Sequence, residues 1–224
     1  MIVVDVLNDA GGREYLLEKY GIRKVPVLAK GEKYAFGQML DPFAKFAGLP
    51  MPGVEGLSPA QLFKKYEMIF LAAQRLTLQI PKEQFLERVI PHRERVLRTL
   101  CYHIFRIGEA FLETCYGAEY SVKIADNEPP DEMVSQEQIV AYGTFVWQEY
   151  EKWWSNNQDP LLTQTLKTYY GDTLAHKVFE RVTWHSAQHC RQLAAVLERM
   201  QIVADRPLSA QDLAGLPMPE RLWE

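Results

Sequence analysis

The chain changes its hydrophobic period once along its length. Residues 1–49 carry short apolar runs that are broken by charged residues and glycines, which predicts short strands and helices. From residue 58 onward, apolar residues recur every three or four positions over long stretches, which predicts amphipathic helices. The intervening phrase LPMPGVEG is rich in Pro and Gly. We therefore expect an α+β protein of two domains, residues 1–49 and 58–224, joined by a linker at 50–57.

The first domain is predicted to have the order β-α-β-β-α. The corresponding ranges are 2–6, 11–20, 24–29, 33–36 and 41–47. Gly21 and Gly48 occupy the positions that follow helix ends, and Asp41 with Pro42 next to it predicts the start of the last helix. Because a β-α-β unit crosses over right-handed and can pair adjacent strands, we expect the first strand to lie parallel to the second.

Four long amphipathic helices are predicted in the second domain. Their approximate ranges are 58–78, 91–116, 135–154 and 172–200. Ser58 followed by Pro59 is typical of a helix start, and Ser135 with Gln138 forms a capping box. Helices of this length predict a four-helix bundle, over which the tail at 208–224 is expected to wrap. Three apolar tail residues are the expected anchors: Leu213, Leu216 and Trp223.

Three of the five histidines fall on the inward stripes of two predicted helices. His185 and His189 are four residues apart, so both project from one face of the fourth helix, and His103 lies on the apolar stripe of the second. A pair of satisfied core histidines would explain the HxxxH spacing alone. Three neutral imidazoles, however, can hold a divalent metal ion and leave positions open for water or substrate. His92 and His176 lie away from these stripes and are predicted at the surface.

Composition excludes several classes of function. The formal net charge is −4 and no run of Lys or Arg exceeds a pair, so nucleic acid is not an expected partner. No stretch of about 18 apolar residues exists, and Asp5 and Asp9 interrupt the N-terminal run, so we expect no membrane span and a cytoplasmic protein. Three cysteines without CxxC spacing, Cys101, Cys115 and Cys190, are predicted to remain thiols.

The first domain resembles the glutaredoxin and thioredoxin-like families over about residues 3–49. The phrases that carry the resemblance are VVDVLND, YGIRKVPVL and KYAFGQ followed by LDPFAKFAGL. The resemblance implies a cis peptide before Pro26, with Val25 and Pro26 as candidate thiol-binding residues. The family's first strand, first helix and cysteine motif are absent. Because disulfide reduction needs an activated thiolate, and residues 1–49 contain no cysteine, no such activity is expected of this domain.

The second domain resembles the DinB-like (DinB/YfiT) superfamily of metal-binding four-helix bundles over about residues 58–224. The matching phrases are LRTLCYHIFRIGEAFLE and WHSAQHCRQL, the latter fitting the pattern HxxxHxxQ. The resemblance implies that His103, His185 and His189 bind a divalent metal such as Zn, Ni or Fe. Gln192 and Arg191 are expected to be polar groups beside these ligands.

This second resemblance also implies chemistry. It suggests a metal-dependent enzyme, a thiol-dependent S-transferase or a hydrolase, that acts on a small electrophile, with a low-molecular-weight thiol as a further small-molecule partner. The alternative is a non-catalytic metal-binding or scaffold protein whose site is structural or vestigial. A shortened sheet and an aromatic-rich third helix leave edges and apolar surface, so we expect a homodimer.

Overall fold

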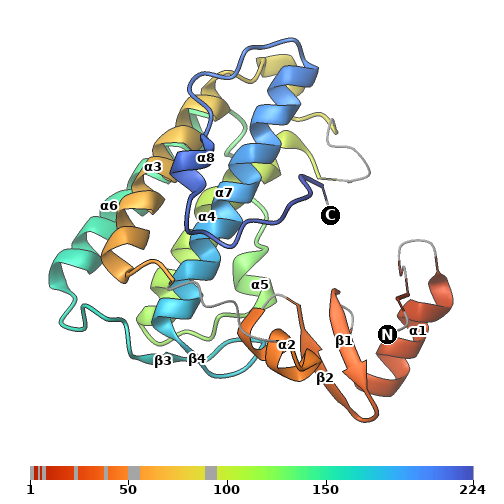
Figure 1. Ribbon diagram of the computed structural model, residues 1–224. Coiled ribbons are helices and arrows are strands. Elements are labelled where there is room, and N and C mark those ends of the chain that lie inside the picture. The colour runs from red at the N-terminus through yellow and green to blue at the C-terminus, as the bar shows by residue number, and fades with distance from the viewer. Residues whose placement is uncertain are drawn as a thin grey trace. The chain divides into compact units, whose positions relative to one another are not determined.

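The chain packs as two compact units. Taken together, their described residues are mixed α/β and mostly helical. The computed structural model describes residues 3–4, 6, 9–22, 25–37, 40–49, 56–88 and 95–223 (Figure 1). The units are Met1–Val54 and Glu55–Glu224. Their division falls within the expected linker at 50–57, of which residues 50–55 lie outside the described residues. Each unit is described below by itself.

The first unit contains a hairpin and two helices. Its elements are α1 (Ala10–Tyr20), β1 (Val27–Lys30), β2 (Lys33–Phe36) and α2 (Leu40–Ala47). The Asp9 side chain accepts a hydrogen bond from the Gly12 N–H at the start of α1, and Gly21 ends this helix with φ 67°. β1 and β2 are antiparallel, with Val27 opposite Phe36. This part of the predicted order is therefore confirmed from the first helix onward.

The strand expected at residues 2–6 is not formed by the described residues of that range. Val3 and Val4 lie outside any strand and are 80% and 49% exposed, and β1 pairs only with β2 in the described part of the unit. Val4 instead lies so close to α1 that a Cβ on Gly12 would meet its Cγ1 at 2.5 Å. The expected parallel pairing with the next strand is not made either, because no described residue of the range 2–6 pairs with β1. The helix at 41–47 also begins one residue early, so Asp41 lies inside α2 and does not precede it.

The second unit is built on four long helices. Its elements are α3 (Pro59–Leu78), the 3-10 turn η1 (Lys82–Gln84), α4 (Leu97–Cys115), α5 (Val122–Ala125), α6 (Gln136–Asn156), β3 (Thr165–Leu166), β4 (Thr173–Leu174), α7 (Ala175–Arg199) and α8 (Ala210–Leu213). α3 and α4 each pack against both α6 and α7, which closes a bundle around one core (Figure 1). Ser58 and Ser135 precede α3 and α6, as the sequence predicts. Both form capping boxes, of which only the one at Ser135 was predicted.

The bundle core is rich in aromatic rings. The fully buried ones include Tyr66, Phe70, Phe105, Phe111, Tyr150 and Phe179. Two helical glycines let these rings approach the backbone. A Cβ on Gly143 would lie 2.7 Å from the Phe105 ring, and one on Gly108 would lie 2.6 Å from the Tyr66 hydroxyl. Trp153 is buried in this core, and Trp147 and Trp154 pack partly buried against it.

Two helices start later than the sequence predicts, and backbone contacts with other parts of the chain lie at both starts. α4 begins at Leu97, where the N–H groups of Leu97 and Arg98 donate to the carbonyls of Glu87 and Phe85; residues 91–94 of the predicted helix lie outside the described residues. α7 begins at Ala175, since residues 173–174 pair with β3. α4 is also buried on almost every side between Cys101 and Gly108, where the sequence suggested a single inward stripe.

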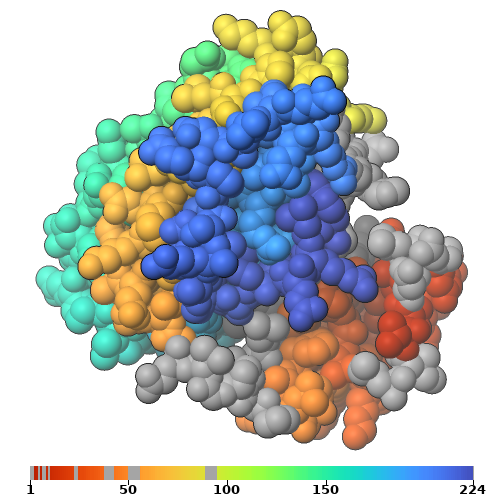
Figure 2. All heavy atoms as spheres, turned by 45° about the horizontal axis from the view of Figure 1, so that its top comes forward, coloured from red at the N-terminus to blue at the C-terminus, as the bar shows by residue number. Residues whose placement is uncertain are grey.

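The C-terminal segment crosses the outer side of α7 after α8 (Figure 1). The expected anchors are confirmed, because Leu216 is buried and Leu213 and Trp223 pack partly buried against the core. In the space-filling view the blue C-terminal residues cover much of the surface between α3 and α7 (Figure 2). The described helices include none whose length and hydropathy would allow it to cross a bilayer.

Candidate metal centre

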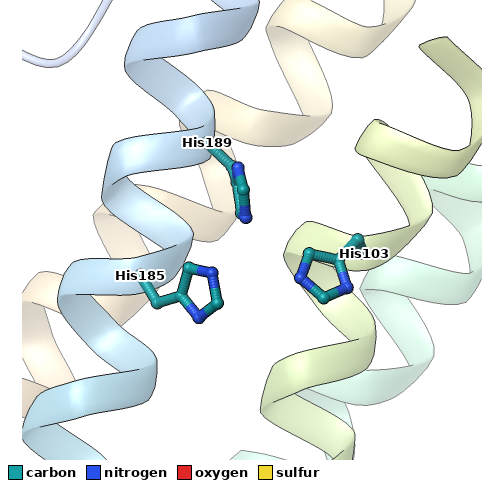
Figure 3. Close-up of side chains that lie close together, drawn as sticks. All are labelled: His103, His185 and His189. Atoms are coloured by element: carbon teal, nitrogen blue, oxygen red, sulfur yellow. The ribbon is translucent and has the colours of Figure 1, made fainter. Parts of the chain in front are cut away.

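His103, His185 and His189 converge from two neighbouring helices. His185 and His189 project from successive turns of α7 toward α4, and His103 projects from α4 toward them (Figure 3). Each ring offers one nitrogen, and these three nitrogens lie within 4.8 Å of one another. The ring centroids are 4.7 to 5.5 Å apart. The predicted convergence is thus confirmed as a group of three imidazoles that could hold a metal ion.

A hydrogen bond between α7 and α4 fixes this convergence. Ser186 follows His185 in the chain, and its Oγ donates to the Ile104 carbonyl at 2.9 Å, next to His103. Ser186 Oγ also lies 3.2 Å from the Tyr66 hydroxyl, in the fully buried core. A buried hydroxyl that found no such partners would cost about 1–3 kcal/mol, so this contact favours one register of α7 on α4.

The surroundings of His185 hold its ring neutral. Burial lowers the pKa of His185 well below its ordinary value, and the neighbouring His189, Arg181 and His103 lower it further. A neutral imidazole keeps a lone pair for a metal ion, whereas an imidazolium has none. The Nδ1 atom of His185 is buried and has no hydrogen-bond partner. This ring therefore has the protonation state expected of a metal ligand.

Gln192 determines which nitrogen of His189 faces the cluster. The Gln192 Nε2 donates to the Leu222 carbonyl at 2.9 Å, so the other end of the amide, Oε1, must point to His189. Gln192 Oε1 lies 2.8 Å from His189 Nδ1. Because an amide oxygen only accepts, Nδ1 carries the proton and Nε2 keeps its lone pair. An outer acceptor of this kind is what orients a metal-binding histidine.

Arg191 is placed differently from Gln192. Its Nη1 donates to the Pro219 carbonyl at 3.0 Å and to Gln188 Oε1 at 2.8 Å. Gln188 Nε2 in turn donates to the carbonyls of Arg221 and Leu222. Arg191 therefore holds the C-terminal segment, and it reaches the histidines only through that segment, where the sequence suggested a place beside the ligands.

The three-imidazole group fits a divalent ion after a small adjustment. Nitrogens at about 2.0–2.1 Å from a tetrahedral ion are about 3.4 Å apart. The nitrogens of this group, within 4.8 Å of one another, would have to close by up to about 1.4 Å, a shift that ring rotations can supply. A three-nitrogen donor set suits Zn, Ni and Fe, which are the ions that the sequence suggested.

Other candidate residues lie away from the cluster. His176 bonds the Leu57 carbonyl at 2.8 Å near the start of α7, and His92 lies outside the described residues. Glu109 accepts hydrogen bonds from Arg106 and from the Tyr142 hydroxyl. All three cysteines are free thiols, as predicted.

The candidate thiol-binding residues lie in the first unit. The peptide bond between Val25 and Pro26 is cis, as the resemblance implies. Pro26 directly precedes β1, and its carbonyl accepts from the Gly37 N–H at 2.8 Å, which closes the end of the hairpin. The role of these two residues stays a prediction.

One group near the histidines was missed from the sequence. Arg181 lies one helical turn before His185 and is 7% exposed, and its guanidinium stands 5.3 Å from the centre of the Tyr170 ring. The signal was its position four residues before His185, which places it on the same face of α7. Tyr120 comes from a distant part of the chain and gave no local signal.

Comparisons with known proteins found no matching family model, no matching curated protein and no matching solved structure. The two family resemblances therefore stay predictions.

Proposed function

We propose that the second unit is a metal-dependent enzyme that binds a divalent ion through His103, His185 and His189. The observation that carries this proposal is the meeting of three imidazole nitrogens, from two helices, within 4.8 Å. Two features of the surroundings support it. The His185 ring is held neutral by burial, and Gln192 leaves the Nε2 lone pair of His189 facing the cluster.

The proposed reaction is the transfer of a thiol to a small electrophile, or the hydrolysis of one. A divalent ion, when bound, would lower the pKa of a thiol or of water, so that the deprotonated nucleophile would exist near neutral pH. Three protein ligands leave room for such a nucleophile, whereas a closed structural site uses four. The chain's own residues would contribute by holding the donor lone pairs and by excluding bulk water from the histidines.

The thiol in this proposal comes from a small molecule and not from the chain. Burial raises the pKa of Cys101 and Cys115 to about 12, and burial raises that of Cys190 as well. A cysteine reacts as its thiolate, so these three side chains are unreactive near neutral pH. Val25 and Pro26 of the first unit are proposed to help hold the small thiol.

Metal analysis of untagged protein tests the proposed site. We expect about one equivalent of divalent metal per chain in the wild type and its loss in His103→Ala. His176→Ala is the matched control, because this histidine lies on α7 but bonds the Leu57 carbonyl. Equal metal content in wild type and His103→Ala would contradict the site.

Activity of the metal-loaded protein tests the proposed reaction. Conjugation of a small thiol to a haloaromatic electrophile, or hydrolysis of an activated ester, should depend on added metal and be lost in His189→Ala. A protein that binds one metal ion but shows neither activity would support the alternative, a non-catalytic metal-binding or scaffold protein.

A further inference from the structure

A second polar group lies beside the three histidines, inside the same unit. Arg181, on α7, is surrounded by Tyr120, Tyr169 and Tyr170. Its Nη2 donates to the Tyr169 hydroxyl at 3.3 Å, and its guanidinium stands over the Tyr170 ring. The Tyr120 ring lies 6.4 Å from both other tyrosine rings. An isolated β-bridge between Tyr120 and Thr168 holds Tyr120 beside the loop that precedes α7.

This group is buried but incompletely satisfied. Arg181 is 7% exposed and Tyr120 is 1% exposed. Arg181 Nε, the Tyr120 hydroxyl and the Tyr170 hydroxyl are all buried without a hydrogen-bond partner. A buried cation normally forms a direct ion pair with an anion. No carboxylate in the described part of the chain forms such a pair with Arg181, although the negative charge of Asp126 acts on its guanidinium.

All the unsatisfied atoms can donate. A guanidinium has only donors, and burial raises the pKa of both Tyr120 and Tyr170, so their hydroxyls keep their protons at neutral pH. His185 Nδ1, also buried and without a partner, is a further donor in the tautomer that leaves its Nε2 for a metal ion. Donors of this kind, gathered around one guanidinium, match an oxygen anion.

The spacing between Arg181 and the histidines limits the size of the molecule that carries the anion. Arg181 and His185 are four residues apart on one face of α7, which is about 6 Å along the helix axis. Arg181 is also one of the charges that lower the pKa of His185. A molecule with its anion at Arg181 and a second polar end at the histidines can therefore be small.

We propose that Arg181, Tyr120 and Tyr170 form a carboxylate-binding site, and that the substrate class of the neighbouring histidine centre is a small thiol or electrophile that carries a carboxylate. The site itself stands on the buried donors alone. The part that names the substrate class rests on the proposed function. Planar carboxylates suit the guanidinium, which donates two parallel hydrogen bonds to such a group.

Titration of the metal-free protein tests the site without metal chemistry. The probes are 3-mercaptopropionate, propionate and the uncharged 2-mercaptoethanol, and the readout is the ¹⁵N–¹H signal of Arg181 Nε, assigned from its absence in Arg181→Lys. We expect both carboxylates to shift this signal saturably at millimolar concentration and 2-mercaptoethanol to leave it unchanged. Isothermal titration calorimetry measures binding in variants that lack this signal, and loss of one charge-assisted contact in Arg181→Met should weaken propionate binding by about tenfold or more.

Matched variants separate a specific site from a general loss of structure. Tyr170→Phe removes one hydroxyl and should weaken propionate binding several-fold while circular dichroism stays unchanged. Arg191→Met, on the same helix but bound to the C-terminal segment, should bind propionate like the wild type. An Arg181 signal that no carboxylate shifts would overturn the inference, and so would tighter binding of inorganic phosphate than of propionate.

A second titration with metal-loaded protein connects the two sites. We expect 3-mercaptopropionate to bind more tightly when metal is present and propionate to be unaffected. Carboxylate binding by a protein that takes up no metal would support this site and contradict the proposed function. Metal uptake with no carboxylate binding would do the reverse.

Discussion

Replacing Gln192 by leucine should weaken metal binding while leaving the three histidines in place. The Gln192 Oε1 accepts from His189 Nδ1 at 2.8 Å, and leucine has a similar volume but no acceptor. Without this acceptor the His189 ring can rotate or take the other tautomer, and its Nε2 becomes a poorer donor. Loss of such an outer contact typically costs about 10–100-fold in metal affinity, which is about 1.4–2.7 kcal/mol.

Competition against a chromophoric zinc chelator would measure this change. Gln188→Leu is the matched control, because Gln188 also donates to the Leu222 carbonyl, at 2.8 Å, but contacts the C-terminal segment and not His189. We expect the dissociation constant for zinc to rise at least about tenfold in Gln192→Leu. The reasoning would be refuted by equal affinities of Gln192→Leu and wild type, or by an equal loss in both variants.

Three further outcomes follow from the same structure. The metal-free protein should lose stability as the pH falls below about 6.5, because the unfolded chain binds a proton at His185 that the folded chain excludes. The loss should reach about 1.4 kcal/mol per pH unit. Urea unfolding at several pH values should show a smaller dependence of the unfolding free energy on pH in His185→Gln. Gly143→Ala should destabilise the protein by about 1–2 kcal/mol, because its Cβ would meet Phe105 at 2.7 Å, and an unchanged or higher melting temperature would count against this packing. The predicted homodimer should appear in light scattering at micromolar concentration. Leu71 on α3 and Phe145 on α6 are exposed apolar side chains that could form the interface, so Leu71→Glu should dissociate the dimer. A monomeric wild type would contradict this prediction.

Local signals predicted most of the helices because their ends are encoded by a few neighbouring residues. Ser58 and Ser135 form capping boxes with residues three positions later, and Gly21 ends α1 in the left-handed conformation. Helix periodicity also predicted the facing of His185 and His189, since residues four apart share a face in any α-helix. These features needed no knowledge of the rest of the chain.

The features that were missed depend on partners far away in the sequence. An apolar run such as VVDV becomes a strand only when another strand pairs with it, and the described residues of this run pair with none. α4 starts where its first N–H groups donate to the carbonyls of Glu87 and Phe85. The tyrosine group around Arg181 likewise joins residues about 60 positions apart, through the bridge between Tyr120 and Thr168.

The C-terminal segment belongs to the candidate metal centre and is not merely a cover for the bundle. A glutamine amide can bond a histidine with either end, so contact with His189 alone would leave the tautomer of that ring undetermined. The Leu222 carbonyl removes this freedom, because it can only accept and therefore binds the NH₂ end of Gln192. Arg191 and Gln188 hold the same stretch of backbone against α7 at Pro219 and Arg221. The lone pair that His189 offers to a metal ion is thus set by a backbone carbonyl more than 30 residues away in the chain.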